Sequence, residues 1–285
     1  FSVVAREFKK DKGAFAALIT LSAILVFVII FNIYIRISGD YKSYFDVDLL
    51  NIFLKPGEDG FLLGTDVGGH SVFGWLMMGM LNSILIAVAV TFITITFGTM
   101  VGLVIAYYGG RVDNFVMRFV DFMVIIPVLM VIIVFVSIKR DYGIGLFIFI
   151  LSAFAWMSST RLVRSKALSE SRRDYVLASK TMGTPDWKIM LKGILPNISS
   201  IIVVEATLSL AANMGIEVGL TYLGFGLPAG TPSIGTMLSY AKDADVLVNK
   251  MYIWLPAALA ILVIVLCINS IGGALRRSLD ARQRL

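Results

Sequence analysis

The sequence predicts an all-α, polytopic membrane protein with six transmembrane helices. Of its 285 residues, 58% are apolar and only 15% are charged, against roughly a quarter charged in soluble domains. The mean hydropathy is +0.87, and a soluble domain of this size could not hide so much apolar surface from water. A cytosolic enzyme, a disordered chain and a secreted disulfide-rich domain are therefore excluded.

Six apolar stretches are long enough to cross a bilayer, which takes roughly 17–25 helical residues. Each must be helical, because lipid offers the backbone no hydrogen-bonding partners. The first is too long for the apolar region of a signal peptide, so we expect a retained span. The six expected spans cover residues 14–35, 83–107, 115–138, 143–159, 198–216 and 252–271.

The positions of Lys and Arg predict how these spans face. With the N-terminus in the cytoplasm, the cytoplasmic segments hold 18 Lys and Arg and the outer segments hold 7. The positive-inside rule then places both termini in the cytoplasm. The net charge of +6 is thus explained by topology and contact with anionic membrane lipid, and we expect no nucleic-acid partner.

Residue types that catalysis or metal binding would need are scarce. His70 and Cys267 are each the single residue of their kind, so we expect no catalytic site and no metal site. The chain also has no GxxxxGK[ST] phosphate-binding loop. We therefore expect no cofactor in this chain, and the energy for any transport must come from another subunit or from a gradient.

The segment 161–197 is long for a connection between spans and is predicted to be folded. Residues 174–182 predict a short helix, which Gly183 ends in the left-handed conformation. Thr184 is expected to cap a second helix, with Pro185 at its first position.

This second helix is expected to end at Pro196, before the fifth span. Trp187, Met190 and Leu191 follow each other at helical spacing and predict an apolar face on it. The segment is thus a helix, a glycine turn and a second helix.

Within this segment, DYVLASKTMGTPDWKIMLKGILPN resembles the cytoplasmic "EAA" loop of binding-protein-dependent ABC importer permeases. The matching elements are Ala178, Gly183 and residues 195–197. Two departures are Ser179, where the loop often has alanine, and His70-Ser71, where the family often has Arg-Asp. Three further stretches resemble the dipeptide/oligopeptide subfamily: GTDVGGHSVFGWLMMGMLNSILIAV, LTYLGFGLPAGTPSIGTML and NSIGGALRRSLDARQRL. The chain is most similar to the second (C-type) permease subunit of a prokaryotic oligopeptide importer.

The resemblance implies the ABC type I importer permease fold in a prokaryotic cell membrane. Residues 1–80 would form a cytoplasmic tail, the first transmembrane helix and a long extracytoplasmic loop. Residues 81–285 would form a core of five transmembrane helices that includes the coupling loop, 161–197. The implied partners are a homologous second permease, two ATP-binding cassette ATPases that hold ATP and Mg, and an extracytoplasmic peptide-binding protein.

The resemblance also implies that the short helix of the loop lies in a groove on an ATPase. Small side chains there allow a close approach, and Gly183 provides the turn. The residues implied at or beside this contact are Asp174, Tyr175, Ala178, Ser179, Met182, Gly183, Thr184 and Pro185.

Two polar residues of the fifth span are candidates for the transport pathway. Glu205 is one, because a carboxylate in a membrane is costly and usually functional. It could equally be a hydrogen-bonded glutamate at a helix contact, or one that lines a wet cavity without specificity. Asn213 is the other, and it can also bond between helices. In the second span, Gly98 and Gly102 are spaced for close helix packing.

The third span carries two features that predict local structure. Arg118 and Asp121 are spaced to pair on one helix face, and Pro127 is expected to kink the helix. His70 is expected at the surface.

Two alternatives to a peptide permease remain open on the sequence. The same kind of subunit could serve nickel or another small solute. A gradient-driven carrier working alone is the alternative from another class. It would need ionisable residues within the membrane, where the expected spans offer Asp121 and Glu205, and it leaves the folded loop unexplained.

Overall fold

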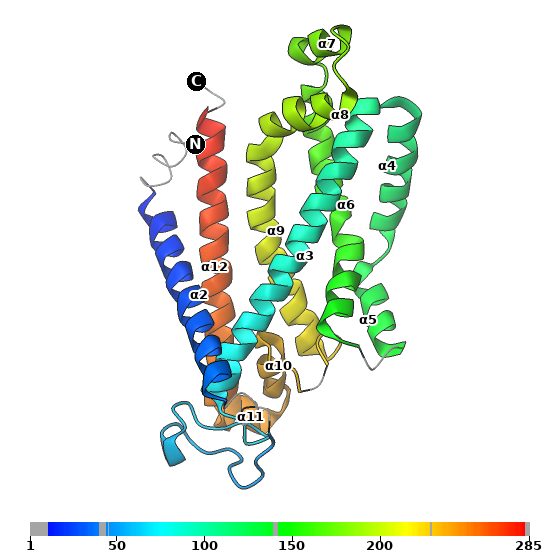
Figure 1. Ribbon diagram of the computed structural model, residues 1–285. Coiled ribbons are helices and arrows are strands. Elements are labelled where there is room, and N and C mark those ends of the chain that lie inside the picture. The colour runs from blue at the N-terminus through cyan, green and yellow to red at the C-terminus, as the bar shows by residue number, and fades with distance from the viewer. Residues whose placement is uncertain (1–10, 40–43, 45, 139–141, 229, 283–285) are drawn as a thin grey trace.

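Long apolar helices run side by side between two polar ends of the molecule (Figure 1). This computed structural model describes residues 11–39, 44, 46–138, 142–228 and 230–282. One end carries the connection with α7 (Asp174–Thr181) and α8 (Asp186–Lys188) and is called the loop end below. The opposite, far end carries the connection from α2 (Lys12–Ser38) to α3 (Val72–Tyr108), together with α10 (Ile234–Ser239) and α11 (Ala244–Asn249).

Five helices are long and apolar enough to cross a membrane, and a sixth crossing is a bent pair. Four of the five are α2 (Lys12–Ser38), α3 (Val72–Tyr108), α6 (Ile144–Glu170) and α12 (Met251–Arg282). The fifth is the continuous helix Asp186–Leu223, which consists of α8 (Asp186–Lys188), η2 (Ile189–Ile194) and α9 (Leu195–Leu223). The bent pair is α4 (Gly110–Ile125) and α5 (Val128–Ile138), which meet at 73°. Each predicted span therefore has its counterpart in the structure.

The bend between α4 and α5 has a local cause. Pro127 lies between the two helices and has no backbone N–H to donate. Ile126 before it is extended, at φ −69° and ψ 128°, as is usual for a residue that precedes proline. The predicted kink at Pro127 is confirmed.

Several helices extend beyond the predicted apolar runs, as α6 does to Glu170 and α12 to Arg282. Helix α3 begins at Val72, where the Ser71 hydroxyl accepts a hydrogen bond from the Gly74 N–H. The boundary expected at residues 80 and 81 therefore falls inside this helix. Helix α9 continues to Leu223 and ends at Gly224, whose φ of +93° is left-handed.

Helices α3 and α6 approach closely at a pair of glycines. A Cβ atom on Gly98 would lie 2.8 Å from the Trp156 carbonyl oxygen, and one on Gly102 would lie 2.8 Å from the Thr160 carbonyl oxygen. The Thr160 hydroxyl also donates to the Gly98 carbonyl at 3.3 Å. The predicted close packing at this glycine pair is confirmed.

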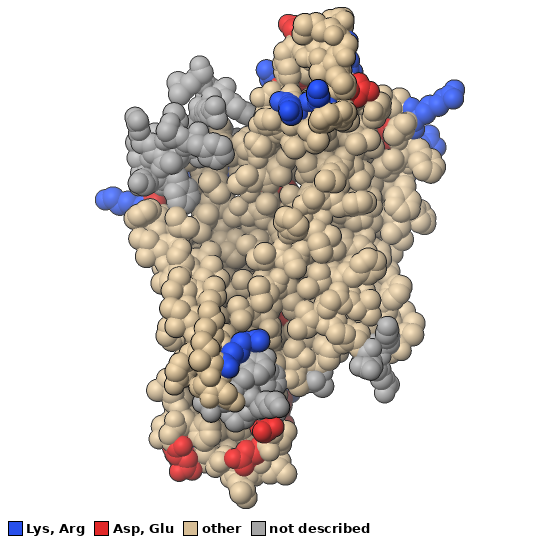
Figure 2. Space-filling model, in the orientation of Figure 1, with Lys and Arg blue, Asp and Glu red and all other residues tan. Residues whose placement is uncertain are grey.

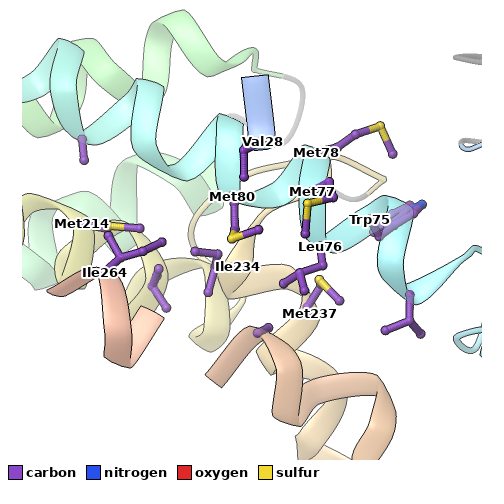
Figure 3. Packing of buried hydrophobic residues seen from close by; sticks show 14 of the residues in the cluster. Val28, Trp75, Leu76, Met77, Met78, Met80, Met214, Ile234, Met237 and Ile264 are labelled. Carbon is purple, nitrogen blue, oxygen red and sulfur yellow. The ribbon is translucent and has the colours of Figure 1, made fainter. Parts of the chain in front are cut away.

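A large apolar core joins α2, α3, α9, α12 and the short helix α10 (Ile234–Ser239) (Figure 3). Met77 and Met80 of α3 pack there with Met214 of α9 and Met237 of α10. Flexible thioether side chains fill such irregular gaps well. The outer faces of the long helices are also apolar, as at Ile30, which is 59% exposed, and such faces suit contact with lipid.

The connection at the far end is held by a buried carboxylate. Asp66 accepts hydrogen bonds from the backbone N–H of Gly68 (2.8 Å) and His70 (2.9 Å), and from the hydroxyl of Tyr240 (3.1 Å). Burial, and then the Asp66 charge, raises the pKa of Tyr240, so this phenol keeps the proton that it donates.

The prediction that His70 is a surface residue is wrong. Its Nδ1 lies 3.0 Å from Asp66 Oδ1, its side chain is 10% exposed, and its ring packs against Trp75 at 4.4 Å between centroids. A folded connection covers the imidazole, which the polar sequence around it did not indicate.

Candidate functional site

The predicted helix and glycine turn are present in the loop. Helix α7 (Asp174–Thr181) is followed by Gly183 at φ +76°. The Gly183 N–H donates to the Lys180 carbonyl and the Thr184 N–H donates to the Ser179 carbonyl, each at 3.0 Å. These two bonds form a Schellman motif, which requires a left-handed residue at the Gly183 position.

The second half of the loop differs from the prediction. Pro185 occupies the position expected for the Thr184 cap, and no side chain caps α8. The helix does not end at Pro196 but continues through the π-helical η2 into α9, where the Leu195 N–H donates to the Met190 carbonyl. Because Pro196 has no N–H, a local π register lets the helix pass it without an ordinary i, i+4 bond.

The loop protrudes from the bundle (Figure 1) and exposes the residues predicted to contact an ATPase. Met182 is 76% exposed. Asp174, Tyr175, Ala178, Gly183 and Pro185 are also exposed, and Ser179 and Thr184 are half-buried. The structure thus brings all eight predicted contact residues to one accessible loop.

The predicted apolar face of the second helix is divided. Trp187 and Leu191 are exposed, whereas Met190 is buried. Met190 packs with Val176 of α7 and Leu103 of α3 in a second apolar cluster, which holds the loop against the bundle.

Tyr175 connects α7 to the two helices that flank the loop. Its hydroxyl donates to Glu170 Oε1 at 3.1 Å and accepts from Asn197 Nδ2 at 3.0 Å. Burial raises the pKa of Tyr175, so the phenol keeps the proton that it donates.

Two ion pairs fasten α4 to α6 at the loop end. The Asp121 carboxylate accepts a hydrogen bond from the Arg161 guanidinium of α6 at 2.6 Å. Its ion-pair partner is therefore Arg161, and not Arg118, which the sequence predicts. Asp113 accepts two hydrogen bonds from the Arg164 guanidinium. The spacing of residues within one helix cannot show that the two helices come this close.

A cavity of about 740 Å³ opens at the loop-end side of α6, α9 and α12. Glu205 lines it, and its Oε1 accepts a hydrogen bond from the Ser209 hydroxyl at 3.3 Å. Among its other lining residues are the cations Lys166, Arg173 and Arg276 and the acid Glu170.

Asn213 does not lie with Glu205. It is 7% exposed and donates to the Thr91 hydroxyl of α3 at 2.9 Å. In this structure it bonds between two helices, which is the second of the roles that the sequence allowed.

Sequence reasoning missed a buried carboxyl group in α9. Glu217 is completely buried and accepts a hydrogen bond from the Thr221 hydroxyl at 3.1 Å. The predicted span ends at residue 216, which leaves Glu217 just outside it. The apolar run that continues to Phe225 could have extended the helix.

Comparison with known proteins identifies the family. The sequence model of one protein family, the binding-protein-dependent transport system inner membrane component, matches residues 95–285 of this chain. The chain belongs to this family. It is therefore a multi-pass membrane protein of a transport family, and the predicted ABC type I importer permease fold is confirmed.

Full-length relatives are similar to almost the whole chain. The oligopeptide transport system permease protein OppC of Lactococcus lactis is 46% identical over 280 residues, which are 98% of this chain and 94% of the relative. OppC of Mycobacterium tuberculosis is 31% identical over 284 residues, 99% of this chain and 95% of the relative. A putative peptide permease of Brucella suis is 31% identical over 281 residues, 99% of this chain and 91% of the relative.

Proposed function

We propose that this chain is a permease subunit of an ATP-driven oligopeptide importer and forms half of the translocation pathway. The observation that carries the proposal is the 46% identity, over 98% of the chain, to a protein named as an oligopeptide permease. Other relatives that span the whole chain bear oligopeptide or peptide permease names as well. These names favour peptides over nickel as the substrate.

The proposed orientation puts the loop end in the cytoplasm. Figure 2 shows most of the visible Lys and Arg around this end, whereas Asp and Glu are visible at both ends. The positive-inside rule favours that orientation. Asp11, before α2, accepts from Arg277 of α12 at 2.6 Å, so the starting end of α2 and the final turns of α12 lie together on the proposed cytoplasmic side.

In this proposal the α7–α8 loop engages the ATPase subunits. Its exposed apolar and small residues, such as Met182 and Ala178, offer a surface on which an ATPase groove could close. A second permease would complete the pathway, and an extracytoplasmic binding protein would deliver peptide to the far end. ATP and Mg would be held by the ATPases and not by this chain.

The cavity beside Glu205 supports a role for this region in the cytoplasmic half of the proposed translocation pathway. Peptides carry an ammonium group and a carboxylate, and the cavity walls carry both charge types, with Glu205 on α9 and Arg276 on α12. Apolar side chains such as Ile201 and Leu208 line the wall between the polar groups, as in many ligand sites.

The proposal is tested by isolating the tagged chain from its native membrane in mild detergent and identifying what accompanies it by mass spectrometry. We expect a second multi-span permease and P-loop ATPases. Cells that lack the chain should lose uptake of a labelled pentapeptide and keep uptake of nickel. Repeated recovery of the folded chain alone, or loss of nickel uptake with normal peptide uptake, would contradict the proposal.

A further inference from the structure

Tyr107 of α3 contacts both helices of the protruding loop. Its hydroxyl donates to Asp186 Oδ1 of α8 at 2.6 Å. On the other side of the glycine turn, Lys180 Nζ of α7 lies 4.1 Å from the centre of the same ring. One side chain of the bundle therefore contacts the loop before and after Gly183.

Two kinds of interaction at Tyr107 hold the loop on α3, and they have different effects. Its ring is 7% exposed and lies in the apolar cluster with Val176 and Met190. Apolar burial holds the loop on the bundle but is not directional. A short hydrogen bond from a phenol to a carboxylate is directional and is stronger than one between neutral groups, so it fixes how the loop is oriented on α3.

Helix α3 can carry a displacement at Tyr107 across the whole molecule. It runs unbroken from Val72 to Tyr108, a length of about 55 Å at a rise of about 1.5 Å per residue. Near its other end, Asn82 donates to the Pro232 carbonyl, just before α10, at 2.8 Å. A single rigid element thus connects the loop with the segment that precedes α10 at the far end.

Tyr175 gives a comparison within the same loop. It bonds Glu170, the last residue of α6, and Asn197, in the first turn of α9. Those bonds keep α7 beside its own chain neighbours. The Tyr107 bond instead joins the loop to a helix distant in sequence, which is what transmission through the bundle needs.

We propose that Tyr107 is a positioning residue that transmits movement of the α7–α8 loop to α3. This inference rests on the proposed importer function. ATP-driven displacement of the loop would pull on Asp186, and the hydrogen bond to Tyr107 would make α3 follow. Without this bond, the loop could move with the ATPase while α3 lags, so that ATP is hydrolysed without import.

The test compares four variants in the complete importer, reconstituted in liposomes with both permeases, the ATPases and the binding protein. They are Tyr107→Phe, Asp186→Asn, the double variant, and Tyr108→Phe as the matched control. Phe keeps the ring, its burial and the Lys180 contact, and removes only the hydroxyl. Tyr108 is the chain neighbour of Tyr107, is 55% exposed, and packs edge-on to it at 5.3 Å.

The readout is the number of labelled peptides imported per ATP hydrolysed, which a merely structural role would not move. A weakened loop would lower the amount of assembled importer and leave this ratio unchanged. We expect the ratio to fall on the order of tenfold in Tyr107→Phe, the lower end of what loss of a hydrogen bond to a charged group does to an equilibrium. The ratio should also fall in Asp186→Asn. In the double variant it should be no lower than in the more impaired single variant.

Any one of three results would overturn the inference. The first is a wild-type ratio of peptide import to ATP hydrolysis in Tyr107→Phe, and the second is a double variant whose loss is the product of two independent losses. A fall of the same size in Tyr108→Phe would also overturn it, because the effect would then not belong to the Asp186 bond. If the wild-type importer took up no peptide at all, the proposed function would fail instead, so the two failures are distinguishable.

Discussion

Gly183 is constrained by backbone conformation and not by space. Its φ is +76°, yet a Cβ atom there would have no neighbour within 4 Å. A left-handed conformation costs an ordinary L-residue roughly 1–2 kcal/mol, and asparagine tolerates it better than most. We therefore expect Gly183→Ala to lower peptide uptake at equal expression and Gly183→Asn to retain more of it. Equal uptake by Gly183→Ala and the wild type would show that the turn tolerates this strain.

Glu205 and Asn213 were predicted together but differ in their surroundings. We expect Glu205→Gln to lower peptide uptake severalfold without changing thermal stability, because it removes a charge from a cavity wall. Unchanged rate and selectivity would remove Glu205 from the pathway.

Asn213→Ala should instead lower stability. It removes the hydrogen bond to Thr91, and side-chain bonds between membrane helices contribute about 0.6 kcal/mol on average. Thermal unfolding in detergent measures this effect. A normal melting temperature combined with lost uptake would place Asn213 on the pathway after all.

The sequence predicts residues whose role depends on local conformation better than residues whose role depends on distant contacts. Gly183 was predicted because a left-handed turn favours glycine wherever the helix packs. The Asp121–Arg161 bond and the burial of His70 depend on elements that meet only in the fold. Tyr107 was missed for the same reason, since its partner Asp186 is 79 residues away in sequence.

At the scale of elements, helix contacts depend on small residues. A Cβ atom on Gly98 would lie 2.8 Å from both the Trp156 carbonyl oxygen and the Ser159 Cβ, whereas one on Gly215 of α9 would meet nothing within 4 Å. We expect Gly98→Ala to destabilise the chain by about 1–3 kcal/mol through overpacking. Gly215→Ala is the matched control and should be neutral or stabilising, because alanine favours helix.

Thermal unfolding of the two alanine variants in detergent measures this difference. Equal melting temperatures would mean that α3 and α6 can separate at little cost. That result would also weaken the view of α3 as a rigid element held firmly against its neighbour.

Helix ends were harder to predict than helices. The apolar runs located every span, because each must bury or expose apolar side chains along its whole length. The true ends depend on caps such as Ser71 and Gly224. Pro196 was expected to end a helix, but a π-helical turn allows the helix to continue.

At the scale of the molecule, the two ends of the bundle have different chemistry. The loop end presents a folded, exposed connection with basic surroundings, and the far end presents an ordered acidic connection. Composition and charge predict a membrane protein with this polarity. Composition and charge do not show which substrate crosses the membrane, because the substrate depends on partner subunits and on a cavity built from three separate helices.

The most direct measurement is uptake of a labelled oligopeptide by liposomes that contain this chain with its second permease and ATPases, in the presence of the binding protein. The account predicts uptake that requires ATP, stops when the ATPases are omitted, and does not respond to collapse of ion gradients. Uptake by this chain alone, driven by an ion gradient and indifferent to ATP, would contradict it.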